Sequence, residues 1–97
     1  MRIAVIGAGS WGTAFTRLLL DRGHEVTLVA RDPAQVEAIR ETGRNPRYLT
    51  TVDLRDAQVA DEPPAGTELY VLAVPSKAFA EVAEALPGSA PALSLTK

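Results

Sequence analysis

The chain has 97 residues, enough for one domain, and a net charge of −2 at pH 7, which gives no reason to expect nucleic acid or an anionic membrane as a partner. It contains no cysteine, which excludes disulfides and thiolate chemistry, and its single histidine and dispersed acidic residues predict no metal site and no catalytic carboxylate pair. No apolar run approaches the roughly 20 residues that cross a bilayer, so we expect a cytoplasmic protein.

The chain begins with the pattern of a strand, a glycine-containing turn and a helix. Residues 1–6 form a short apolar run typical of a buried strand, and residues 10–22 have helical spacing before a stop at Gly23. One apolar stripe is expected on this helix, made of Trp11, Ala14, Phe15, Leu18 and Leu19. The strand and the helix are joined by a G-x-G-x-x-G segment.

The three glycines of this segment each suit a separate task. Gly7 permits a tight turn, Gly9 lets the backbone approach a pyrophosphate, and Gly12 lets the helix pack close to the strand. The amides and the dipole of the helix N-terminus also favour phosphate. We therefore predict a dinucleotide-binding turn; the alternative is a turn whose glycines serve packing alone.

A second strand, at residues 25–30, is followed by Arg31. In dinucleotide-binding domains this strand normally ends in an acidic residue that binds the ribose hydroxyls of NAD. A guanidinium suits a 2′-phosphate instead, so Arg31 slightly favours NADP over NAD, unless it is simply a solvated side chain. Asp32 is the alternative ribose ligand, but its position favours a role as a helix cap.

The second helix is expected to begin at the Asp32 cap and to end at Gly43. Pro33 occupies its first position and Gln35 completes a capping box with Asp32. In chain order we then expect a polar loop at 44–48, a short strand at 52–54 or 57–60, a turn at 63–66, a strand at 68–74, a helix at 76–86 and a strand at 92–95.

This alternation of strands and helices predicts a Rossmann-type, doubly wound α/β domain covering residues 1–97. Its sheet should be mainly parallel, with helices on both faces. Ligands bind at the carboxyl ends of the strands in such sheets, so Gly7, Arg31, Pro75 and Lys97 should gather at one edge. His24, in a helix-to-strand turn, is expected to be a surface residue.

Five segments of the chain resemble the cofactor domain of bacterial NAD(P)-dependent glycerol-3-phosphate dehydrogenases. They are residues 7–14, 26–32, 44–49, 71–76 and 94–97. The loop Asn45-Pro46-Arg47-Tyr48-Leu49 and the ending Ser94-Leu95-Thr96-Lys97 are the specific parts, since the glycine turn is shared with many reductases. The chain departs from the family pattern at Thr50-Thr51, where Pro-Gly is usual, and at 52–67, which lacks an acidic helical segment.

The resemblance implies reduction of dihydroxyacetone phosphate to sn-glycerol 3-phosphate by NAD(P)H, which feeds glycerophospholipid synthesis. By position, Ser10, Trp11 and Tyr48 would contact the cofactor, Arg31 its adenosine phosphate end, and Lys97 both nicotinamide and substrate. The ammonium of Lys97 would either bind the substrate phosphate or polarise its carbonyl. The implied cofactor-binding residues are Gly7, Gly9, Ser10, Trp11, Gly12, Arg31, Tyr48 and Lys97.

The proton-donating lysine of the family lies in a later helical substrate domain, which this chain is expected to lack. We therefore expect no catalytic residue here, weak dinucleotide binding and no turnover by the chain alone. We also expect a homodimer in the full-length protein. The alternatives are the cofactor domain of a ketopantoate or 6-phosphogluconate type reductase, against which the 44–49 loop argues, and a dinucleotide-sensing regulatory module. Trp11 either packs in the core or flanks the phosphates or the nicotinamide.

Overall fold

The computed structural model describes residues 1–74 and 91–94. Its strands are β1 (Arg2–Ile6), β2 (Glu25–Val29), β3 (Gln58–Ala60), β4 (Leu69–Leu72) and β5 (Ala92–Ser94), and its helices are α1 (Ser10–Asp21) and α2 (Pro33–Thr42). The predicted α/β class is confirmed, and of the two positions proposed for the third strand, the later one is right. The helix expected at 76–86 lies outside the described residues.

Neither described helix has the length and apolar character that crossing a membrane requires.

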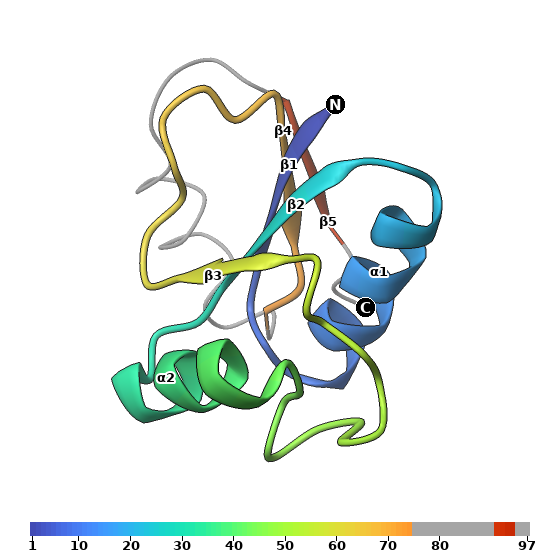
Figure 1. The fold of residues 1–97 in the computed structure, drawn as a ribbon. Coiled ribbons are helices and arrows are strands. Elements are labelled where there is room, and N and C mark those ends of the chain that lie inside the picture. The colour runs from blue at the N-terminus through green and yellow to red at the C-terminus, as the bar shows by residue number, and fades with distance from the viewer. Residues whose placement is uncertain (75–90, 95–97) are drawn as a thin grey trace.

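All the strand pairs are parallel, and the strands of the sheet lie in the order β3-β2-β1-β4-β5 (Figure 1). From β1 the chain moves outward through α1 to β2 and through α2 to β3. Right-handed crossovers in one direction place both helices on the same face of the sheet. The chain then returns to β4 on the other side of β1. The strand order therefore reverses between β1 and β4, and in open α/β sheets ligands bind at such a switch point.

Apolar side chains are buried on both faces of the sheet. The face below the two helices forms a core with Val36 and Ile39 of α2 and with Leu54, which is only 1% exposed although it lies outside any helix or strand. A second buried cluster lies on the opposite face and consists of Ala4, Ile6, Val29, Tyr70 and Leu72. Burial on both faces explains why these strands are continuous apolar runs rather than alternating ones.

The apolar stripe expected on α1 faces the core only in part. Phe15 and Leu19 are partly buried and pack against the core, whereas Trp11, Ala14 and Leu18 are exposed. The buried residues of the helix are Gly12, Thr13 and Thr16. A Cβ on Gly12 would lie 1.8 Å from the carbonyl oxygen of Gly7, so the helix approaches the turn as closely as a glycine allows. This contact turns the small residues of α1 towards the sheet and leaves much of the stripe outside.

The ends of α2 follow the local sequence. The Asp32 side chain accepts a hydrogen bond of 2.9 Å from the Ala34 amide, Pro33 occupies the first turn, and Gly43 ends the helix with a φ of +72°. The capping box expected between Asp32 and Gln35 does not form, because within the described residues the Asp32 amide makes no hydrogen bond to the Gln35 side chain. That side chain is buried, and its Nε2 donates to the Ala8 carbonyl and to Asn45 Oδ1.

Two buried threonines of α1 provide a test of this packing. Thr16 Oγ1 has no hydrogen-bond partner in the described part of the chain, whereas Thr13 Oγ1 accepts from Asn45 Nδ2 at 3.0 Å. Thr16→Val should leave the free energy of unfolding unchanged or raise it by about 1 kcal/mol, because a buried unsatisfied oxygen is removed. Thr13→Val should lower it by about 1–2 kcal/mol. Urea denaturation measures both, and equal losses would contradict the assignment.

Candidate dinucleotide-binding site

The carboxyl ends of the strands meet at one edge of the sheet. The last residues of four strands pair in register, namely Ile6, Val29, Ala60 and Leu72. Gly7 and Arg31, which follow β1 and β2, therefore lie at the same edge, as the sequence predicts. Pro75 and Lys97, the other residues predicted there, lie outside the described residues.

Gly7 forms a tight turn at the switch point between β1 and β4. Its φ is +110°, and a Cβ there would lie 2.4 Å from the carbonyl oxygen of Ala73. Its amide donates to the Val29 carbonyl at 2.9 Å, and the Ala73 amide donates to the Ile6 carbonyl at 2.8 Å. Both the backbone conformation and the space available therefore require glycine at this position.

Gly9 differs from Gly7 and Gly12 because no described residue requires a glycine at this position. Its φ of −83° suits any residue, and a Cβ there would have no atom of residues 1–74 or 91–94 within 4 Å. The space that a side chain would fill lies directly before the N-terminus of α1. An open space of this kind fits a ligand that approaches the backbone, as the pyrophosphate of a dinucleotide does in glycine turns of this spacing.

The first turn of α1 has the electrostatic character of an anion site. Its leading amides have no acceptor within the helix, and the helix dipole adds positive charge at this end. No acidic residue lies in the first turn, and Ser10 is exposed. Trp11 is 61% exposed, which excludes core packing and leaves its ring at the surface next to the turn.

A buried polar cluster supports the turn from below, and we call its members Ala8, Thr13, Gln35 and Asn45 the Asn45 network. Asn45 is fully buried, and its Nδ2 donates to the Ala8 carbonyl at 2.8 Å and to Thr13 Oγ1 at 3.0 Å. Gln35 Nε2 donates to the same carbonyl at 3.0 Å and to Asn45 Oδ1 at 3.1 Å. These hydrogen bonds satisfy polar groups that would otherwise be costly to bury.

The Asn45 network also holds the loop that contains Tyr48. Asn45 Oδ1 accepts from the amides of Arg47 at 3.0 Å and of Tyr48 at 3.3 Å. One side chain thus joins the glycine turn to Tyr48, which is 43% exposed. The family resemblance implies that Tyr48 contacts the cofactor, but it assigns no site role to Asn45 or Gln35. The only available signal was that Asn45 begins the loop that carries the family resemblance.

Asp32 acts as a helix cap, as the sequence favours, and both of its oxygens are engaged. Oδ1 accepts from the Ala34 amide, and Oδ2 pairs with the guanidinium of Arg47. The Ala34 amide, and after it the Arg47 guanidinium, hold the pKa of Asp32 below its usual value. Arg31 is exposed and makes no hydrogen bond or ion pair with any residue in 1–74 or 91–94.

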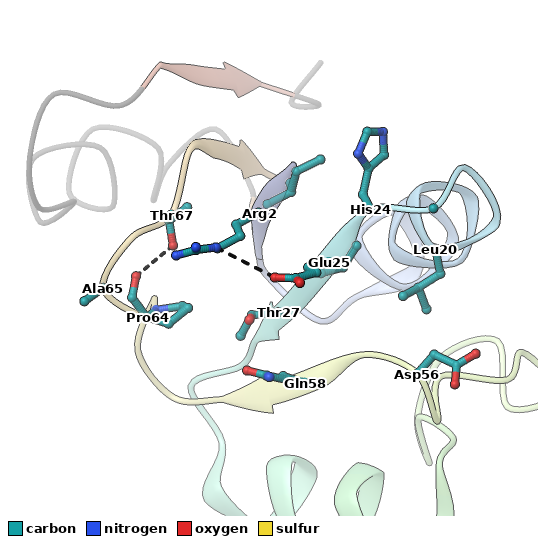
Figure 2. Close-up of a pocket in the computed structure, with 13 residues that line it drawn as sticks. Arg2, Leu20, His24, Glu25, Thr27, Asp56, Gln58, Pro64, Ala65 and Thr67 are labelled. Carbon is teal, nitrogen blue, oxygen red and sulfur yellow. Dashed lines mark hydrogen bonds and ion pairs between the residues drawn. The ribbon is translucent and has the colours of Figure 1, made fainter.

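A separate depression of about 650 Å³ lies at the opposite edge of the sheet, where the strands begin (Figure 2). Arg2, His24, Glu25 and Thr67 are among its lining residues, and Arg2 pairs with Glu25 at 3.8 Å. The C-terminal end of α1 leads into this region, and its carbonyl groups disfavour anions. This depression is therefore poorly suited to a dinucleotide. Within the described ranges no group of acidic, histidine or cysteine side chains is arranged to hold a metal ion.

A parallel sheet of order 3-2-1-4-5, with a G-x-G-x-x-G turn at its switch point, defines a Rossmann-type dinucleotide-binding domain. The sequence comparison is more specific. Residues 2–97 match the family described as "NAD-dependent glycerol-3-phosphate dehydrogenase N-terminus". The chain belongs to this family.

Curated relatives agree with this assignment. The chain is 48% identical over 85 residues to a glycerol-3-phosphate dehydrogenase [NAD(P)+] of Frankia casuarinae, and the match covers 84% of the chain and 25% of the relative. It is 43% identical over 95 residues to the enzyme of the same name from Xanthomonas campestris pv. campestris, covering 94% of the chain and 28% of that relative. The chain thus spans about a quarter of the length of these enzymes.

Solved structures show the same fold. A glycerol-3-phosphate dehydrogenase from Coxiella burnetii matches with a TM-score of 0.86 and 30% identity, over 99% of this chain and 32% of that one. A probable 2-dehydropantoate 2-reductase from Bacillus subtilis matches with a TM-score of 0.74 and 24% identity, over 100% of this chain and 34% of that one, and shows the fold alone. The alternative assignment to a ketopantoate reductase is therefore not supported beyond the shared fold.

Alanine substitutions at Gly12 and Gly9 distinguish a glycine required by packing from one that leaves space for a ligand. Gly12→Ala should lower the free energy of unfolding by about 3 kcal/mol or more, because the added Cβ meets the Gly7 carbonyl oxygen, a backbone atom. Gly9→Ala should change it by only about 0.5 kcal/mol, since the added methyl group meets nothing. Chemical denaturation compares the two variants, and a similar loss in both would show that Gly9 is also required by packing.

Proposed function

We propose that the chain binds NAD(P)H at the N-terminus of α1 as the cofactor part of an oxidoreductase. The reaction of the whole enzyme is the reduction of dihydroxyacetone phosphate to sn-glycerol 3-phosphate, which feeds glycerophospholipid synthesis. The observation that carries the proposal is Gly9, whose lack of a side chain opens a space at a helix N-terminus that no atom of the described residues fills. The curated relatives named for this activity support the choice of reaction.

In this proposal the pyrophosphate lies against the glycine turn and the first amides of α1. Ser10 and Trp11, both exposed at the start of that helix, border the cofactor, and Tyr48 approaches it from the loop held by Asn45. Nicotinamide supplies the hydride when it is bound. Lys97 is proposed to contact both nicotinamide and substrate, where its ammonium either holds the substrate phosphate or polarises the carbonyl.

We also propose a preference for NADP over NAD. Arg31 follows β2 and has no partner among the described residues, so its guanidinium is available to a 2′-phosphate. Asp32 is poorly placed to bind ribose hydroxyls, because its two oxygens already accept from Ala34 and Arg47. The ion pair with Arg47 also reduces the repulsion that this carboxylate would exert on a phosphate.

Hydride transfer also needs a substrate held in line with the nicotinamide and a proton source for the developing alkoxide. The family resemblance places the proton-donating lysine in a helical substrate domain. We therefore expect the 97-residue chain alone to bind dinucleotide weakly and to show no turnover. We further propose that the enzyme is a cytoplasmic homodimer.

Arg31→Ala tests the cofactor preference. The variant should lose about 1–3 kcal/mol of binding free energy for NADPH, the range for hydrogen bonds to charged groups, and little for NADH. Isothermal titration of both nucleotides measures this difference. Arg22→Ala is the matched control, because it removes an exposed arginine at the other end of α1.

Equal losses for the two nucleotides in Arg31→Ala would refute contact with a 2′-phosphate while leaving dinucleotide binding intact. A wild-type chain that binds neither nucleotide would refute the proposed function itself.

A further inference from the structure

We infer that Gln35 and Asn45 are positioning residues that orient the Ala8–Gly9 peptide, so that the Gly9 amide is aimed at the pyrophosphate of the cofactor. The inference rests on the proposed function and adds two residues to its site. Neither of them touches the cofactor in this account. Their effect is transmitted through one peptide group.

The Ala8 carbonyl is held towards the interior by two side-chain donors. Asn45 Nδ2 lies 2.8 Å and Gln35 Nε2 lies 3.0 Å from its oxygen, and Ala8 itself is 8% exposed. The peptide is planar and trans, so the carbonyl oxygen of Ala8 and the amide hydrogen of Gly9 point in opposite directions. Because the carbonyl points inward, the Gly9 N–H points outward.

The outward side of this peptide is the open space at the start of α1. Among the described residues, the Gly9 N–H makes no hydrogen bond and the position of its missing side chain has no neighbour within 4 Å. It therefore joins the first amides of α1 as a donor for an anion. Two hydrogen bonds to the Ala8 oxygen also polarise the peptide and strengthen its N–H as a donor.

Gly9 makes room for a ligand, but it also leaves the preceding peptide in need of the hydrogen bonds from Gln35 and Asn45. Glycine is conformationally permissive, so the Ala8–Gly9 peptide can turn more easily than a peptide between bulkier residues. A turned peptide would present the negative carbonyl to the phosphates. The two buried amides oppose this rotation, because turning the carbonyl outward would leave donors of Gln35 and Asn45 without an acceptor.

Gln35→Met and Asn45→Ala in the 97-residue chain test the inference. Each removes one donor from the Ala8 carbonyl, and methionine keeps the approximate length of glutamine. We expect NADH affinity to fall roughly three- to tenfold in Gln35→Met and at least as much in Asn45→Ala. The control is Arg40→Met, which removes hydrogen bonds of 3.0 and 2.8 Å to the Val59 carbonyl and leaves the Ala8 carbonyl with both donors. It should bind NADH as the wild type does.

The amide resonance of Gly9 in ¹⁵N-labelled protein distinguishes positioning from a general loss of stability. NADH should shift this resonance strongly in the wild type and in Arg40→Met, and clearly less in Gln35→Met at saturating ligand. If Asn45→Ala does not fold, Gln35→Met decides alone. Unchanged NADH affinity, or reduced affinity with an unchanged Gly9 shift, would overturn the inference and leave the proposed function standing. A wild-type chain that binds neither NADH nor NADPH would instead overturn the proposed function, and the inference with it.

Discussion

The close approach of Gly12 to the carbonyl oxygen of Gly7 is the constraint on which the rest of the site depends. With any larger residue at position 12, α1 would have to move away from β1 and from the switch point of the sheet. The same contact sets the rotation of the helix, which buries Thr13 and leaves Trp11 at the surface. The position of the helix N-terminus and the exposed indole follow from this glycine, and the missing side chain of Gly9 adds the open space beside them.

The Asn45 network extends this local arrangement across the fold. It joins the glycine turn, α1, α2 and the following loop through side chains of Thr13, Gln35 and Asn45, with partners up to 37 positions apart in the sequence. A fully satisfied, buried polar cluster restricts the backbone to one arrangement more strongly than apolar contacts do. The candidate site is therefore built on a supported turn, while Tyr48 and Arg47 lie on a loop attached to the same asparagine.

Features that depend only on residues close in the sequence could be predicted. The Asp32 cap, the Gly43 stop and the apolar strands are local, and the glycine turn follows from its spacing and context. The exposure of Trp11 could not be predicted, because helical periodicity finds an apolar stripe but not the contact that decides which side faces the sheet. Gln35 fits the spacing of a capping box, yet a distant buried carbonyl is its acceptor. Tertiary packing decides which of the two roles Gln35 takes. It also decides that Asn45 is buried.

The central claim is that a dinucleotide binds where the strands end and α1 begins. Mapping all backbone amide shifts during a titration of the ¹⁵N-labelled chain with NADPH tests it most directly. We predict the largest shifts at residues 7–13, with further shifts at Arg31 and Tyr48, and none around the depression drawn in Figure 2. Shifts concentrated at Arg2, Glu25 and Thr67, with the glycine turn unchanged, would contradict it.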